Sequence, residues 1–105
     1  MNEPPQSDLF DARRDQGIAR AVDHADRVID QWSEDAYKLL LAYAGGREFL
    51  SEEFVDYARA ALPAPPDARA FGGPIRRAVN AGVIRRIGYR LDKYRSPKPV
   101  WSGRP

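Results

Sequence analysis

The 105-residue sequence has no cysteine and only one histidine, His24, and these absences exclude several kinds of site. Without cysteine there is neither a disulfide framework nor a thiolate metal ligand, and one histidine cannot build the usual metal cluster. A phosphate-binding loop is also missing, because FGGP (71–74) lacks the lysine and threonine of a P-loop. Paired acids such as Glu52 and Glu53 fall in the first turn of an expected helix, where they favour the helix dipole. We therefore expect a protein that is not an enzyme and carries no metal or cofactor.

Long hydrophobic runs are absent as well. The apolar run Leu39–Ala42 is far too short to cross a bilayer, and the N-terminal MNEPPQSD lacks the basic start and apolar stretch of a secretory signal. A hydrophobic content of 43% nevertheless supports a real core. These features predict a cytoplasmic protein with one small domain plus an extension, and with no membrane partner.

Acidic residues are almost missing from the C-terminal third. Residues 68–105 contain 10 Lys/Arg and the single acid Asp92, whereas residues 1–67 contain 7 Lys/Arg and 14 Asp/Glu. The two parts carry net charges of +9 and −7, so the +2 of the whole chain conceals the division. A basic segment with aromatic residues between its charges suits a polyanion, and an acidic segment suits a protein partner or an opposing face of the fold.

Helix start and stop signals divide the acidic part into short elements. The expected elements are, in order, a disordered tail (1–6), an N-terminal helical extension (7–32) with one helix over about 8–31, a helix capped by Ser33 that ends at Gly45–Gly46, a short strand (48–50), a helix that begins at Ser51, and a stiff proline-rich connector (62–67). The side chains expected to face the core from the second and third helices are Tyr37, Leu40, Leu41, Ala44, Phe54, Ala58 and Ala61.

The basic part is expected to contain a helix followed by a hairpin. The helix ends near Asn80, with Gly82 as its stop, and begins either at Asp67 as the cap or at Gly73 with Pro74 at the first helical position. At 100° per residue, two faces separate, one apolar (Phe71, Ile75, Ala78, Val79) and one polar (Arg69, Gly73, Arg76, Arg77, Asn80). After the helix come a β-branched strand (83–89), a loop (90–98) and a short edge strand (99–101).

This order of elements resembles the winged-helix fold, over about Ser33–Trp101. EFLSEEFVDYA (48–58) resembles the short strand that leads into the second winged-helix helix, and AFGGPIRRAVNAGVIRRIGYR (70–90) resembles the recognition helix and the first strand of the wing. The resemblance implies a mainly α fold with a small β-hairpin, in which a winged-helix domain (33–105) follows the helical extension. The IRRA segment and the late VW also resemble small proteins of phage and prophage replication or regulation regions, which implies the cytoplasm of a bacterium or phage-infected cell.

The polar face of the basic helix and the wing are the candidate nucleic-acid-binding surface. Arginine can bind guanine or phosphate in bidentate fashion, asparagine suits adenine, and basic residues on a hairpin can follow a phosphate backbone. Two plainer alternatives remain: a solvated basic surface, and a hairpin on which Tyr89 and Trp101 close the core while the charges keep an edge strand soluble. The candidate nucleic-acid-binding residues are Arg69, Arg76, Arg77, Asn80, Arg85, Arg86, Arg90, Lys93, Arg95 and Lys98.

An apolar stripe runs along the N-terminal helix at helical spacing. It could pack against its mate in a second chain and form a homodimer, since added helices often serve this purpose in winged-helix proteins, or it could pack on its own domain. The candidate oligomerisation residues are Ile18, Val22, Ala25, Val28, Ile29 and Trp32.

Two functions fit these observations. The first is a small winged-helix protein that binds duplex DNA, as a phage- or prophage-type regulator of transcription or an accessory of replication. The second is a winged-helix interaction module that binds a host or phage replication or transcription protein through its acidic part, without contacting DNA.

Overall fold

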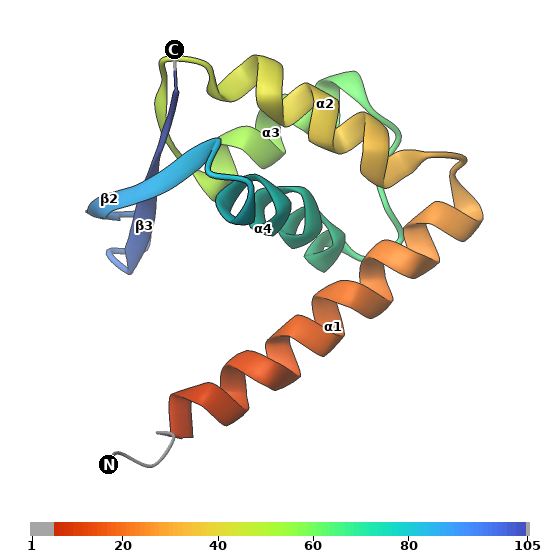
Figure 1. Ribbon diagram of the computed structural model, residues 1–105, viewed down its shortest axis with the longest axis horizontal. Helices are drawn as coiled ribbons and strands as arrows, with labels where there is room; N and C mark the ends of the chain where they lie inside the picture. The colour runs from red at the N-terminus through yellow and green to blue at the C-terminus, as the bar shows by residue number, and fades with distance from the viewer. Residues whose placement is uncertain (1–5, 105) are drawn as a thin grey trace.

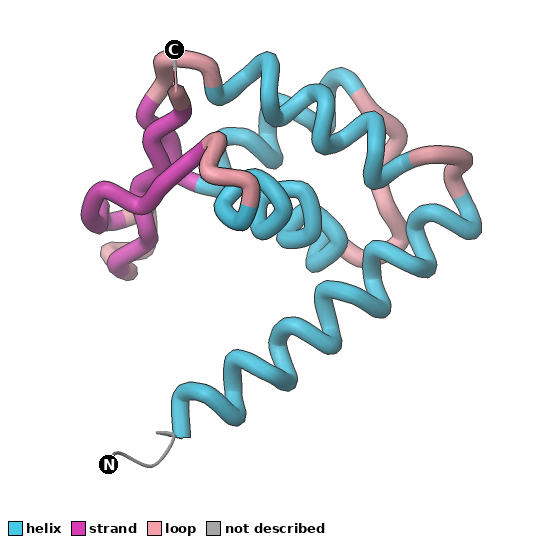
Figure 2. Tube along the Cα trace, in the orientation of Figure 1, coloured by secondary structure: helices cyan, strands magenta, loops and turns pink. Residues whose placement is uncertain are grey.

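The computed structural model describes the backbone of residues 6–104 and the side chains of residues 12–104. The predicted tail at 1–6 therefore falls almost entirely outside the described residues. Figures 1 and 2 show a helical body with a β-hairpin at one end. The elements are α1 (Gln6–Val28), α2 (Trp32–Ala44), β1 (Glu48–Leu50), α3 (Ser51–Ala61), the 3-10 helix η1 (Ala68–Phe71), α4 (Gly72–Asn80), β2 (Ile84–Leu91) and β3 (Pro97–Gly103).

The three strands form one antiparallel sheet in the order β1-β3-β2. Phe49 of β1 pairs with Trp101 of β3, and on the other side of β3 Arg86 of β2 pairs with the same Trp101. The register shifts between Arg86 and Gly88, so Ile87 forms a bulge. The expected class, mainly helical with a small antiparallel hairpin, is confirmed, and the order of elements is compatible with a winged-helix-like arrangement.

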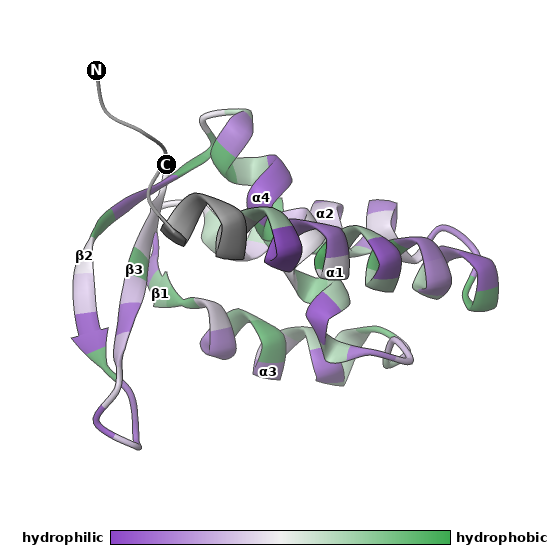
Figure 3. Ribbon diagram, turned by 90° about the horizontal axis from the view of Figure 1, so that it is seen from below, coloured by the Kyte–Doolittle hydropathy of each residue, from purple (hydrophilic) through white to green (hydrophobic). Residues whose placement is uncertain are grey.

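The core lies where the helices meet the sheet. Its largest fully buried side chains are Trp32, Leu40, Phe49, Phe54 and Ile84. Hydrophobic and hydrophilic positions alternate along α1 in Figure 3, as expected of a helix with one buried side. None of the described helices combines the length and hydrophobicity that a bilayer crossing requires.

The junction between α1 and α2 differs from the prediction. Ser33 does not cap α2 with its side chain, because its N–H and hydroxyl both donate to the Asp26 carboxylate, at 2.8 and 2.6 Å. Gln31 adopts a left-handed conformation (φ 56°), so α1 ends at Val28 and Trp32 already belongs to α2. The buried stripe of α2 is consequently Trp32, Ala36, Leu40 and Ala44, and Leu41, expected in the core, is 37% exposed.

Of the two predicted starts of the basic helix, the Asp67 cap is found, at the 3-10 helix that precedes α4, whereas Gly73 is not a cap and Pro74 is not the first helical residue. The Asp67 carboxylate accepts a hydrogen bond from Arg69 N (2.9 Å) and caps η1, and α4 then begins at Gly72. The predicted stop is confirmed, because Gly82 adopts φ 74° two residues after Asn80. Phe71, Ile75 and Ala78 are buried as expected; Val79 and, in α3, Ala61 are exposed instead of facing the core.

The hairpin is longer than predicted, since four of the nine residues of the expected loop at 90–98 belong to strands. Its turn spans 92–96 and is organised by the Asp92 carboxylate, which accepts hydrogen bonds from Tyr94 N (2.8 Å) and Ser96 N (2.9 Å). These two hydrogen bonds hold the pKa of Asp92 below its ordinary value of 3.8, and the bond from Ser96 has the largest effect on that pKa. A carboxylate that binds two amides of a turn can fix a hairpin that sequence periodicity does not reveal.

Candidate nucleic-acid interface

Three predicted contact residues near α4 are engaged in ion pairs. Arg76 pairs with Asp15 of α1 at 2.5 Å. Arg77 pairs with Glu34 of α2 at 2.8 Å, and its guanidinium lies 3.9 Å from the centroid of the Tyr37 ring. Arg69, in η1, hydrogen-bonds the Asp67 side chain and so lowers the pKa of that carboxyl. These contacts leave Asn80 as the exposed polar side chain of α4 for which the structure gives no partner.

Helix α1 covers the first turn of α4. A Cβ atom added to Gly72 would lie 2.8 Å from Ile18 Cδ1, and one added to Gly73 would lie 2.5 Å from Val22 Cγ2. These distances are shorter than carbon–carbon contact allows, so the absence of side chains is what lets the two helices approach. The prediction that Gly73 lies on the outward, polar face of the helix is wrong, because Val22 of α1 covers Gly73.

The hairpin carries a group of five cations that form no ion pair with a carboxylate of the described residues. Within the described part of the chain, Arg85, Arg86, Lys93, Arg95 and Lys98 are exposed and form no ion pair. Arg90 differs, because it pairs with Glu53 of α3 at 2.7 Å. The same Glu53 oxygen accepts a hydrogen bond from Leu50 N (2.7 Å), so one carboxylate caps α3 and holds the hairpin. These five exposed cations therefore lie close together on β2, β3 and their turn, where Asp92 is the acidic residue nearest in sequence.

A groove of about 700 Å³ runs between α1, α4 and the hairpin. Its rim carries Arg14, Arg76 and Arg86 from the three elements, and its floor includes Val79 and Trp101. Trp101 was assigned to the core; it is half-buried, packs against the core and donates from Nε1 to Ser51 Oγ (2.9 Å). The groove thus combines a basic rim with an apolar floor.

The apolar stripe of α1 packs on its own domain. Ala25 and Trp32 are buried, Val22 and Ile29 pack against the core, and Ile18 contacts the Gly72 backbone. Val28 alone among the six is exposed, at 60%. The homodimer stays a prediction, but the stripe proposed to form it is mostly occupied within one chain.

Asp15, Glu34 and Glu53 are site residues that the sequence did not reveal. Each lies on a different element of the fold from its arginine, and Glu34 and Glu53 are 43 and 37 positions away from theirs. No local spacing rule connects residues so far apart. The feature of the sequence that points to such pairs is the high acidic content of the first 67 residues. Some of these acidic side chains form the face that opposes the basic segment.

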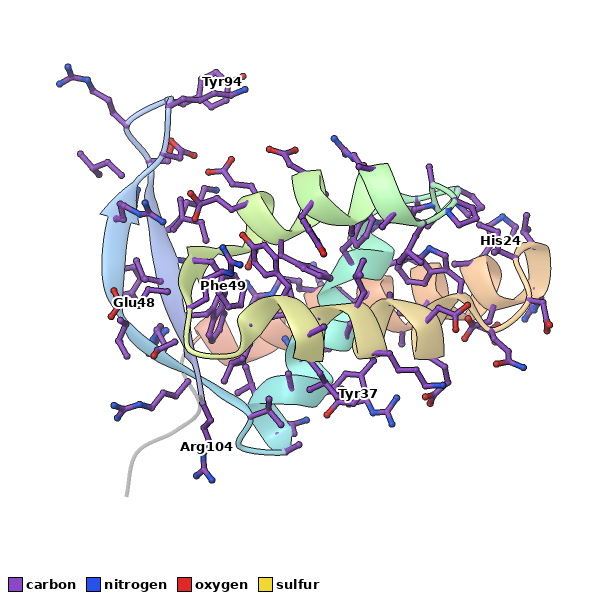
Figure 4. The ribbon with its side chains drawn as sticks, turned by 90° about the horizontal axis from the view of Figure 1, so that it is seen from above. His24, Tyr37, Glu48, Phe49, Tyr94 and Arg104 are labelled. Carbon is purple, nitrogen blue, oxygen red and sulfur yellow. The ribbon has the colours of Figure 1, made fainter. Side chains whose placement is uncertain are left out.

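The remaining chemistry of the described residues is sparse. No three histidine or acidic side chains among them come together as a metal site. His24 is exposed on α1, at the end of the molecule opposite the hairpin (Figure 4). Comparison with known proteins found no match among protein families, curated proteins or solved structures.

Proposed function

We propose that this protein is a small winged-helix domain that binds duplex DNA, mainly through the hairpin. The sheet order β1-β3-β2, with the hairpin directly after α4, supports this fold assignment. The observation that carries the functional proposal is the set of unpaired cations on the hairpin, since free arginine and lysine side chains supply most of a protein's affinity for DNA. Such a domain would serve as a regulator or a replication accessory and would perform no catalysis.

The paired arginines have a secondary part in this proposal. Arg76 and Arg77 keep side-chain exposures of 40% and 50%. The Asp15 oxygen that Arg76 contacts is itself shielded from solvent. The Arg77–Glu34 pair, in contrast, is exposed on both sides, and such a pair contributes only about 0–1 kcal/mol. A phosphate could therefore replace the Glu34 carboxylate at small cost. Asn80 lies at the end of α4 that α1 leaves uncovered, which suits it for contact with a base edge.

The test compares two double variants that remove the same charge. Arg95→Ala with Lys98→Ala removes two free hairpin cations, and Lys38→Ala with Arg59→Ala removes two exposed cations from α2 and α3. Affinity for a random duplex is measured at several salt concentrations. We expect the hairpin variant to bind more weakly and its log–log salt slope to fall by about 1.8, for two lost phosphate contacts.

The control variant should bind nearly as well as the unmodified chain, with an unchanged slope. Equal losses in both variants would show that binding follows net charge and not the hairpin. A wild-type chain that binds no DNA even at low salt would overturn the proposal and leave the protein-interaction function.

A further inference from the structure

Four large apolar side chains stand exposed on the hairpin among its cations; Ile87 is 42% exposed, and the other three are more exposed. Tyr89, Leu91 and Tyr94 are 62%, 60% and 75% exposed. Charged residues alone suffice to keep a hairpin edge soluble, so these side chains serve neither the core nor edge protection. Exposed apolar groups concentrated on one short element are typical of a contact surface.

The hairpin register places Tyr89 on the same face of the sheet as Pro99. Tyr89 pairs with Pro99, and directly opposite residues of neighbouring strands share one face of a sheet. Pro99 and Trp101, two positions apart on β3, both line the groove. Tyr89 itself lies outside this groove and lines a neighbouring hollow of the hairpin with Ile87, Arg90 and Val100.

Tyr94 is presented by the turn that Asp92 organises. The turn uses the backbone N–H of Tyr94 and leaves its side chain without a hydrogen-bond partner among the described residues. Arg95 adopts a left-handed conformation (φ 63°), which closes the turn. Figure 4 shows Tyr94 at the tip of the hairpin.

Each tyrosine has a cation beside its ring. Arg86 lies 5.4 Å from the centroid of Tyr89, and Lys93 lies 5.2 Å from that of Tyr94. Contact with a duplex backbone requires only the cations, because base faces in a duplex are covered by their neighbours. A ring with an adjacent cation suits an unpaired base, which stacks on the ring while its phosphate meets the charge.

We infer that Tyr89 and Tyr94 stack on unpaired bases, so that the preferred ligand is DNA with a single-stranded segment beside a duplex. This inference rests on the proposed function and specifies its substrate class. The hairpin cations hold the backbone, and the two rings distinguish an open strand from a closed duplex.

The experiment uses two probes, a blunt duplex and the same duplex with a single-stranded oligo-dT tail, at one salt concentration. Fluorescence anisotropy gives the affinity of the full chain and of the variants Tyr89→Ala, Tyr94→Ala and Tyr57→Ala. Tyr57, on α3, is 48% exposed and is the matched control. We expect each hairpin substitution to weaken binding of the tailed probe about tenfold and to leave the blunt probe within about twofold. Tyr57→Ala should change neither, and Tyr→Phe at 89 or 94 should retain tailed-probe affinity.

Equal losses on both probes, or no loss on either, would overturn the inference. Circular dichroism checks that each variant is folded, which the exposure of these side chains leads us to expect. If the wild-type chain binds both probes equally and remains sensitive to Arg95→Ala with Lys98→Ala, this inference fails and the proposed function stands. If it binds neither probe, both fail.

Discussion

Single backbone positions set how closely the elements of this domain pack. Gly103, at the end of β3, is buried against the C-terminal end of α2. Its N–H donates to Arg47 O (3.0 Å), in the connection between α2 and β1. A Cβ atom at this position would lie 1.9 Å from the carbonyl oxygen of Ala44. The obstacle is backbone, which cannot rotate away as a side chain can. Gly88, on β2, has nothing within 4 Å of the corresponding point.

We therefore expect Gly103→Ala to destabilise the fold and Gly88→Ala to leave it nearly unchanged. The first substitution overpacks a closed contact, which typically costs about 1–3 kcal/mol, and the second adds a methyl group to open space, with an effect within about 0.5 kcal/mol. Urea unfolding followed by circular dichroism measures both. Equal stabilities of the two variants would contradict the close contact between β3 and α2.

At the scale of elements, the packing of α1 on α4 has the largest bearing on the proposed function. Ile18 and Val22 lie on Gly72 and Gly73, and the ion pair between Asp15 and Arg76 extends this contact. The Oδ1 atom of Asp15 is shielded from solvent. Asp15 of α1 therefore pairs with Arg76, a side chain that the proposed function assigns to DNA. The Asp15 carboxylate and a DNA phosphate would compete for this one guanidinium.

Asp15→Asn should raise affinity for duplex DNA about two- to fivefold, because it removes the charge that competes with phosphate for Arg76. Asp23→Asn is the matched control, since it removes the same charge and also frees an arginine, Arg27, but within α1 itself. Anisotropy titrations of both variants give the comparison. A gain of the same size in the control would mean that Asp15 acts through net charge alone.

At the scale of the whole molecule, the described part of the chain measures 44 × 30 × 29 Å, with the hairpin at one end of the long axis (Figure 1). The stripe expected to join two chains lies mostly inside this body. We expect light scattering at micromolar concentration to give the mass of one chain, 11.8 kDa. A dimeric mass that persists in Val28→Glu, which alters the one exposed member of the stripe, would place a dimer interface on another surface.

The order of elements could be predicted from the sequence because its signals are local. Glycines such as Gly82, the connector prolines and the acids after Ser51 each act within one turn of the chain. The candidate cations could be found from composition alone. Their partners could not, because the pairing of Arg76 with Asp15 depends on how α1 crosses α4. The buried face of α2 differs from the prediction for a related reason. Ser33 hydrogen-bonds to Asp26, seven positions earlier, and α2 then begins one residue before Ser33, at Trp32.

The two-glycine contact between α1 and α4 would link the proposed DNA binding to a conformational equilibrium. While Ile18 and Val22 rest on Gly72 and Gly73, the first turn of α4 cannot enter a DNA groove. If a complex uses that turn, only molecules with α1 displaced are competent, and the apparent affinity is the intrinsic affinity multiplied by their population. A factor that holds α1 elsewhere would then strengthen DNA binding without touching the DNA.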